Sequence, residues 1–191
     1  MSDLPERLMQ KLRTELRAGE KIVWAAQPIA GQVMKTSFLI WLFFIPWTLF
    51  SLFWTAGASG FHWPDFSQLH IFSFFPLFGL PFIFIGLCGL STPFWIQNKA
   101  KNTVYAVINL RLLICVFGKT INIQAYHPKD VTHINRVEKP DGSGDLYFST
   151  EHYRDSDGDN RTKKEGFAAV RDVKNVERII EDFIKANQTK P

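Results

Sequence analysis

Three aspartates at alternate positions, Asp155, Asp157 and Asp159, are the residues that most resemble a metal site. Alternating carboxylates open the calcium loop of an EF-hand, which also needs glycine at its sixth position and glutamate at its twelfth. Those positions hold Asn160 and Gly166, and no pair of apolar helices flanks the segment. The spacing therefore favours a solvated hairpin tip, and we predict no metal site.

Other residues with reactive side chains lack the neighbours that their chemistry needs. His127, His133 and His152 do not have metal-ligand spacing, and no cysteine joins them. Residues 118–120 (Gly-Lys-Thr) resemble the end of a phosphate-binding loop, but the first glycine of that motif would fall at Leu113. We therefore assign neither feature a ligand.

Catalytic serines and nucleotide fingerprints are also missing. Ser143 and Ser149 have no nucleophile elbow around them, and no glycine-rich dinucleotide motif opens a helix. The net charge of +4 comes without a recognition helix or an aromatic platform for bases. We predict no enzymatic activity, no cofactor and no nucleic-acid partner.

A long apolar stretch, residues 36–97, organises the chain. No Lys, Arg, Asp or Glu occurs in residues 36–64 or 66–98, and each run exceeds the roughly 20 residues that cross a bilayer as a helix. The pattern predicts a transmembrane hairpin with spans at about 37–57 and 71–95, without a Gly-x-x-x-Gly pairing motif. A soluble core hairpin is the alternative, although core helices are usually shorter and interrupted by charges.

Basic residues flank this hairpin, whereas its connecting loop, residues 58–70, has no Lys or Arg. The flanking residues are Arg7, Lys11, Arg13, Arg17, Lys21 and Lys35 before the hairpin and Lys99 and Lys101 after it. The positive-inside rule then places both termini in the cytoplasm and the loop outside. Neither span carries a charged residue for moving an ion, which argues against a transporter.

The segment before the hairpin, residues 1–35, combines a helix with a strand. Residues 3–18 predict an amphipathic helix, whose apolar stripe consists of Leu4, Leu8, Met9, Leu12 and Leu16. This stripe either lies in the membrane interface or packs on the domain that follows. Residues 21–27 favour a strand without a local partner, so we expect Ile22 and Trp24 to pair with or pack on residues 103–170.

After the hairpin, residues 98–191 predict about six short strands and a final helix. The strands are expected at Thr103–Ile108, Arg111–Phe117, Thr120–Tyr126, Val131–Glu138, Asp145–Tyr153 and Gly166–Val170. In the third strand we expect Ile121, Ile123 and Ala125 to form the buried face. Consecutive strands joined by hairpins pair antiparallel, and the helix that Asp172 caps is available to cover the sheet.

Several segments together resemble the bacterial pleckstrin-homology-like (PH-like) membrane proteins. They are GEKIVWAAQP, the apolar hairpin, TVYAVINLRLLI, DGSGDLYF, GFAAV and DVKNVERIIEDF, spread over most of residues 19–186. The residues that match the family pattern are Tyr105, Asn109, Arg111, Asp141, Gly142, Ser143 and Gly144. Ile108 replaces the usual threonine before Asn109. The resemblance implies a split antiparallel β-barrel capped by a C-terminal helix, with no enzymatic activity.

These expectations describe a membrane-anchored binding or scaffold module at the bacterial inner membrane, which recruits a protein partner. Two alternatives stay open: a sensor of anionic lipid headgroups, or an accessory subunit of a larger membrane complex. Besides the bilayer, the expected partner is another protein or a second copy of the chain. The candidate lipid-facing basic rim comprises Lys35, Lys99, Lys101, Arg111 and Lys119, with Arg111 and Lys119 at hairpin turns expected to point the same way.

Overall fold

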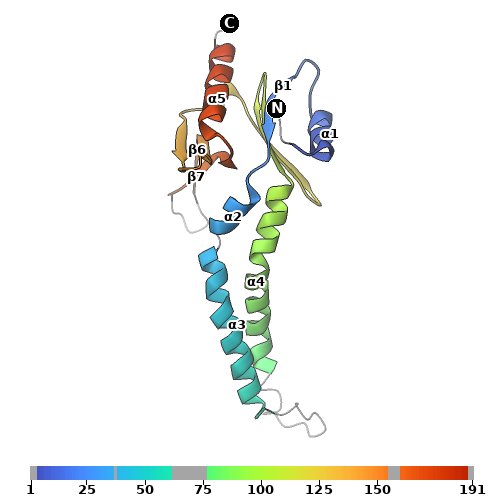
Figure 1. The fold of residues 1–191 in the computed structure, drawn as a ribbon, viewed down its shortest axis with the longest axis vertical. Coiled ribbons are helices and arrows are strands. Elements are labelled where there is room, and N and C mark those ends of the chain that lie inside the picture. The colour runs from blue at the N-terminus through green and yellow to red at the C-terminus, as the bar shows by residue number, and fades with distance from the viewer. Residues whose placement is uncertain (1–3, 37, 62–76, 155–159, 189–191) are drawn as a thin grey trace. The chain divides into compact units, whose positions relative to one another are not determined.

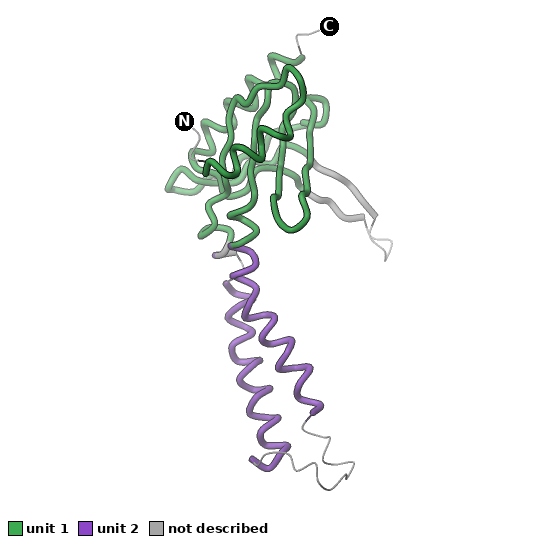
Figure 2. The backbone as a smooth tube through the Cα atoms, turned by 90° about the vertical axis from the view of Figure 1, so that its right-hand side faces the viewer, with its two compact units in different colours: residues 1–33, 98–191 green, residues 34–97 purple. Residues whose placement is uncertain are grey.

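The computed structural model describes residues 4–36, 38–61, 77–154 and 160–188 (Figure 1). Its elements are α1 (Glu6–Thr14), β1 (Ile22–Ala26), α2 (Ala30–Thr36), α3 (Phe38–Ala58), α4 (Leu80–Lys101), β2 (Thr103–Ile108), β3 (Leu112–Phe117), β4 (Ile121–Tyr126), the 3₁₀ turn η2 (Pro128–Asp130), β5 (Asn135–Glu138), β6 (Gly144–Arg154), β7 (Asn160–Val170) and α5 (Val173–Gln188). The chain divides into two compact units. Unit 1 contains residues 1–33 and 98–191, and unit 2 contains residues 34–97 (Figure 2).

The strands of unit 1 form two antiparallel sheets, with the orders β1-β2-β3-β4 and β5-β6-β7. β1 pairs with β2, so that Trp24 lies opposite Val107 and Ala26 opposite Tyr105. This pairing confirms that the strand before the hairpin joins the domain after it. The hairpin is consequently an insertion between two paired strands.

The central strands of the first sheet, β2 and β3, are buried on both faces, because their alternate residues enter different apolar clusters. Tyr105 and Val107 belong to an inner core that also contains residues of the second sheet and of α5. Val104 and Ala106 face an outer core that includes Leu8 and Leu12 of α1. The apolar stripe of α1 therefore packs on the sheet, which decides between the two interpretations of this helix.

Helix α5 covers the inner core, as its sequence pattern predicts. Its buried residues are Val173, Val176, Ile180 and Phe183. Aromatic rings fill the space between the sheets: Phe167 stacks on Tyr105 with ring centroids 4.8 Å apart and meets Phe148 edge-on. Trp24 of β1 stacks on the same Phe167 ring at 5.8 Å, so the strand before the hairpin completes the core.

Three strand predictions need correction. On β4 the buried side chain is Tyr126, whereas Ile121 and Ala125 are exposed, because the inner core lies on the Tyr126 face of this edge strand. β5 begins at Asn135 rather than residue 131. β7 begins at Asn160 rather than residue 166, because it pairs with β6 along most of the length of both strands.

Unit 2 contains the two apolar helices, which are long enough to cross a membrane. Only 11% of the apolar stretch of α3 and 17% of that of α4 is buried in the protein, unlike the core helices of a soluble fold. α4 continues to Lys101 rather than ending at residue 95, and the expected start of its span at residue 71 lies outside the described residues. Small residues bring the helices together: a methyl group on Gly79 would overlap Thr55, and one on Gly86 would overlap Thr48.

Candidate functional site

Two sequence features far apart in the chain meet at a buried ion pair. Glu20 precedes β1 and Arg111 precedes β3, and their side chains are only 2% and 8% exposed. The Arg111 guanidinium donates to Glu20 through Nε at 2.8 Å and through Nη2 at 3.0 Å. Its Nη2 also donates to the carbonyl of Glu15 at 3.1 Å. This bidentate geometry holds the end of the N-terminal segment against the β2–β3 turn.

Asn109 completes this contact through its amide. Its Oδ1 accepts the backbone N–H of Lys21 at 2.9 Å, and its Nδ2 donates to the carbonyl of Gly19 at 3.1 Å. We call Glu20, Lys21, Asn109 and Arg111 the N-terminal clasp. Burial opposes ionisation of Glu20, but the hydrogen bonds from Arg111 and from the backbone of Arg17 outweigh it, so the pKa of Glu20 lies below its ordinary value.

The second family-like motif forms another polar contact, at the β5–β6 turn. Gln32 at the start of α2 donates to Asp141 at 3.1 Å and to Ser143, and it accepts a hydrogen bond from Lys139 at 2.9 Å. Gly142 turns the chain with a φ of 76°, and a side chain on Gly144 would overlap the carbonyl of Val137. We call Gln32, Lys139, Asp141 and Ser143 the α2 clasp. Both motifs thus tie residues before the hairpin to residues after it.

Two residues of the predicted basic rim, Arg111 and Lys119, do not lie as expected. Arg111 is buried in the N-terminal clasp and cannot reach a lipid surface. Arg111 and Lys119 also lie at opposite ends of the first sheet, because β3 runs from one turn to the other. Consecutive hairpin turns lie at opposite ends of the strand that joins them, so the predicted strand order already separates Arg111 from Lys119, and grouping them in one rim was the error.

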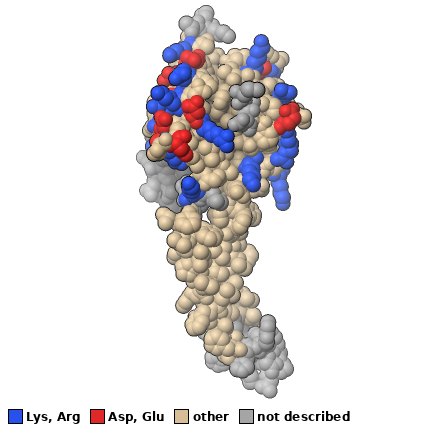
Figure 3. Space-filling view, in the orientation of Figure 1, with Lys and Arg blue, Asp and Glu red and all other residues tan. Residues whose placement is uncertain are grey.

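A different set of basic residues gathers where α4 leads into β2. The N–H of Phe117 donates to the carbonyl of Asn102 at 2.8 Å, which places the β3–β4 turn with Lys119 at this end of the sheet. Arg7 of α1 donates to the side chain of Asn102 at 3.0 Å. We define the basic end as Arg7, Lys11, Lys99, Lys101 and Lys119. In Figure 3 the visible charged side chains gather over unit 1, and the visible face of the hairpin carries none.

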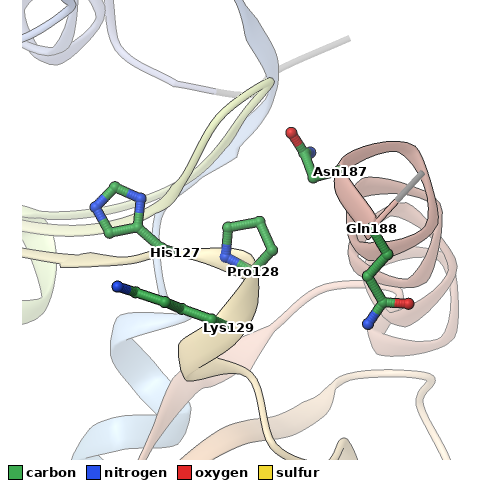
Figure 4. Close-up of a pocket in the computed structure, with 5 residues that line it drawn as sticks. All are labelled: His127, Pro128, Lys129, Asn187 and Gln188. Carbon is green, nitrogen blue, oxygen red and sulfur yellow. The ribbon is translucent and has the colours of Figure 1, made fainter. Parts of the chain in front are cut away.

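A cavity of about 580 Å³ lies between η2 and the end of α5. Figure 4 shows that the polar ends of His127 and Lys129 point away from the amides of Asn187 and Gln188. Asn187 is engaged by hydrogen bonds to the carbonyls of Asn109 and Phe183. The polar groups do not converge on one point, so this cavity offers no defined chemistry.

A groove runs beside β1 and the segment that follows it. It encloses about 470 Å³ and is lined by residues 24–30 and by Arg171, the one ionisable residue among the described residues that line it. Arg171 is exposed and follows directly on β7. We call this cavity the β1 groove. The sequence did not reveal it, because nothing in the local pattern brings Arg171 beside β1.

The described residues contain no group of three or more His, Cys, Asp or Glu that could hold a metal ion. Asp155, Asp157 and Asp159, the residues of the rejected calcium loop, lie outside the described part of the chain. Comparisons with family models, curated proteins and solved structures found no match for the chain.

Proposed function

We propose that this chain is a membrane-anchored binding module of the PH-like class, which recruits a protein partner at the bacterial inner membrane. The order of its strands, four in one sheet and three in the next, supports the class, as does the C-terminal helix on the inner core. The resemblance of the sequence to PH-like membrane proteins implies this arrangement. The two apolar helices supply the anchor.

The exposed sheet edges carry the recruiting role. The edge strands β1, β4 and β5 each expose an apolar side chain: Val23 is 60% exposed, Ile121 54% and Val137 50%. Edge strands also offer backbone hydrogen-bonding groups, which an extended segment of another protein uses to add a strand. A module that is already anchored needs no membrane affinity of its own, so these edges are available to a protein partner.

The basic residues on both flanks of the hairpin support a cytoplasmic location for both termini. Ser59→Cys in a Cys88→Ala background should label with an impermeant thiol reagent on intact cells. Native Cys115 should stay unlabelled, because burial raises its pKa to about 11. Lys119→Cys is the matched control and should label only after lysis. Labelling of Lys119→Cys on intact cells instead would reverse the topology.

One crosslinking experiment separates the three functions under consideration. A photo-crosslinking amino acid is placed singly at Val23, Ile121 and Val137 on the edge strands, and at Leu39 and Phe53 on α3. The α3 positions are 76% and 67% exposed. After irradiation in native membranes, a recruiting module should give discrete protein adducts from an edge strand.

The other outcomes distinguish the alternatives. Protein adducts from α3 alone would indicate an accessory subunit whose interface is the hairpin. Lipid adducts alone at all five positions would contradict protein recruitment. A buried position, Leu113, serves as the background control because its side chain is 0% exposed.

The basic end supports anionic-lipid binding as a second candidate function. Lys99 and Lys101 lie in the last turn of α4, and the register brings Lys119 and Arg7 to the same end of the sheet. Each basic residue near an anionic surface contributes on the order of 1 kcal/mol.

Native mass spectrometry of the full chain tests this candidate by counting the phosphatidylglycerol molecules that remain bound. The triple variant Lys99→Glu/Lys101→Glu/Lys119→Glu should retain fewer than the wild type. Lys174→Glu/Arg178→Glu on α5 is the control and should retain as many as the wild type. Equal retention by all three proteins would exclude the basic end as a lipid site.

A further inference from the structure

Strand β4 is the edge of the first sheet with the least protection against pairing. Its sequence, Ile-Asn-Ile-Gln-Ala-Tyr, has no charged residue and no proline, and it pairs with β3 in continuous register. Natural edge strands are usually blunted by charges, prolines, bulges or short length. Among the described residues, no strand lies on the other side of β4. This edge is therefore open to an added strand.

The other edge strands of the two sheets carry such protection. β1 has a bulge between Ile22 and Trp24. β5 is only four residues long, and its Arg136 pairs with Glu138 and with Glu177 of α5. β7 begins with a strongly charged segment, NRTKKE. β4 is therefore the edge where pairing with another chain meets the least opposition.

The register shows which backbone groups of β4 point to its open edge. The N–H of Phe117 donates to the carbonyl of Asn102, so the odd-numbered residues of β3 bond to β2. The even-numbered residues of β3 then bond to β4, where they lie opposite its even-numbered residues. Because backbone direction alternates along a strand, the remaining N–H and C=O groups of β4 face the open edge. They belong to Ile121, Ile123 and Ala125.

The side chains of β4 indicate what kind of segment fits beside it. Its odd-numbered residues lie on the outer face of the sheet, where Ile121 is 54% exposed, Ala125 is exposed and Ile123 is half-buried against the outer core. A neighbouring strand needs apolar side chains on this face, because β4 has no charge to compensate the burial of a charged one. On the other face, Asn122 and Gln124 suit amide or hydroxyl side chains. The fitting segment is therefore uncharged and alternates apolar with polar residues.

A second copy of the chain fits this edge poorly. Gln27 follows β1 and donates to the carbonyl of Lys101 at 2.6 Å, so both links to the hairpin leave unit 1 at the same end of the sheet. Two β4 strands paired antiparallel would point these ends in opposite directions, although the two hairpins share one membrane. In a symmetric parallel pair the faces of the partner would be reversed, which brings apolar residues beside amides. These arguments favour a segment of a different protein.

We propose that β4 binds an extended, uncharged segment of a partner protein, which adds a strand to the first sheet beside Ile121, Ile123 and Ala125. This inference rests on the proposed function, because it names the edge and the kind of segment through which the module recruits its partner.

The test selects a display library of random peptides six residues long, the length of β4, against the full chain in nanodiscs. Peptides that bind empty nanodiscs are removed first. Wild-type protein should enrich uncharged peptides in which apolar residues alternate with polar ones. Ile121→Lys should not bind these peptides, because it places a charge on the apolar face of the edge. Val137→Lys on β5 is the matched control, since Val137 is 50% exposed, and it should bind them as the wild type does.

A proline variant separates backbone pairing from side-chain contacts. Ala125→Pro removes an N–H that faces the open edge and leaves the hydrogen bonds between β3 and β4 in place. It should bind the enriched peptide on the order of tenfold more weakly, which corresponds to about 1.4 kcal/mol. Its thermal unfolding should stay close to that of the wild type. Ala125→Ser keeps the N–H and should bind the peptide as the wild type does.

N-methylation of the synthetic peptide tests the same pairing without altering the protein. In an added strand only alternate N–H groups face β4. N-methylation at one set of alternate residues should therefore abolish binding, and at the other set it should leave binding unchanged.

Three results would each overturn the proposal: no enriched peptide, enriched peptides that bind Ile121→Lys as well as the wild type, or N-methyl effects without alternation. Photo-crosslinked adducts from Ile121 that contain only a second copy of the chain would also overturn it. Protein adducts from Val23 or Val137 together with any of these results would leave the recruiting function standing. Only the assignment of its surface to β4 would then fail.

Discussion

Unit 1 and unit 2 are stabilised by contacts of different kinds. In unit 1 the described segments far apart in the chain are joined by charged and amide side chains, such as Glu20 with Arg111 and Gln32 with Asp141. In unit 2 the described helices meet largely through small residues, and the hydroxyls of Thr48, Ser51 and Thr55 donate to carbonyls of their own helix. The indole N–H groups of Trp41 and Trp47 on α3 also donate to the carbonyls of Leu90 and Phe82 on α4. Unit 2 therefore has the contacts expected in a lipid solvent, where polar side chains donate to carbonyls of their own helix or of the neighbouring helix.

This difference shows which kind of contact selects the native pairing of segments in each unit. The clasps of unit 1 fix which residues before the hairpin meet which residues after it, and directional hydrogen bonds leave few alternatives. The close contacts of the glycines in unit 2 depend on shape, because Gly79 and Gly86 fit Thr55 and Thr48 at the same seven-residue spacing. Substitutions that break each kind of contact should accordingly affect one unit and spare the other.

The largest effect should follow from Arg111→Met, which leaves the Glu20 carboxylate buried without its partner. Breaking one side of a buried ion pair costs about 3–5 kcal/mol, so β1 should open far more often. Hydrogen exchange of residues 20–26 in the full chain measures this opening. Lys119→Met removes an exposed charge at the other end of the sheet and is the matched control. Equal exchange in both variants would contradict the role of the clasp.

Leu12→Ala should destabilise unit 1 by about 2–5 kcal/mol, because the side chain of Leu12 on α1 is fully buried in the outer core. Leu49→Ala on α3 is its counterpart in unit 2, where the side chain is 62% exposed. Thermal unfolding in detergent micelles should show a large loss for the first variant and little change for the second. Similar losses would mean that α3 is packed rather than exposed to lipid.

Gly86→Ala should weaken the hairpin by about 1–3 kcal/mol, because the added methyl group overlaps Thr48. Gly57→Ala is the control, since open space surrounds that glycine. Unfolding followed by tryptophan fluorescence measures this loss, because unit 2 holds every tryptophan in the sequence except Trp24. A change in the hydrogen exchange of β1 in Gly86→Ala would show that the two units are coupled.

The smallest effect concerns pH. The pKa of Glu20 is lowered in the folded protein, so the ion pair stabilises unit 1 above the ordinary glutamate pKa of about 4.3. That stabilisation is lost as pH falls below this value and through the folded-state pKa. The free energy of unfolding of Glu20→Gln should therefore fall less than that of the wild type as pH decreases below about 4.3. Because Asp141 also has a lowered pKa, the difference between wild type and Glu20→Gln is the quantity to measure.

Periodicity and turn residues predicted most elements of the fold. Local patterns predicted the first apolar helix, the strand at Thr103–Ile108 and the burial of α5. Such patterns are clear where a single environment, lipid or protein core, surrounds all the apolar positions of an element. The pairing of β1 was predictable because an unpaired strand needs a partner. For α1 the pattern identified the apolar stripe but could not say whether lipid or a sheet covers it.

The candidate sites were harder to predict, because they depend on register and on distant contacts. Arg111 read as a surface cation, since nothing local indicates that Glu20 lies beside it. The contacts of Gly79 and Gly86 were not predicted, because these glycines are seven residues apart and do not form a Gly-x-x-x-Gly motif. The β1 groove was not predicted, because nothing in the local sequence pattern brings Arg171 beside β1.

The central claim is that residues 1–33 belong to the fold of unit 1, with the hairpin inserted between β1 and β2. The direct test replaces residues 34–97 by a flexible Gly/Ser linker and compares this chain with residues 98–191 alone. The linked chain should be soluble and unfold in one cooperative thermal transition, whereas residues 98–191 alone should show none, because they lack β1, α1 and Glu20. Cooperative unfolding of residues 98–191 at the same temperature as the linked chain would contradict the claim.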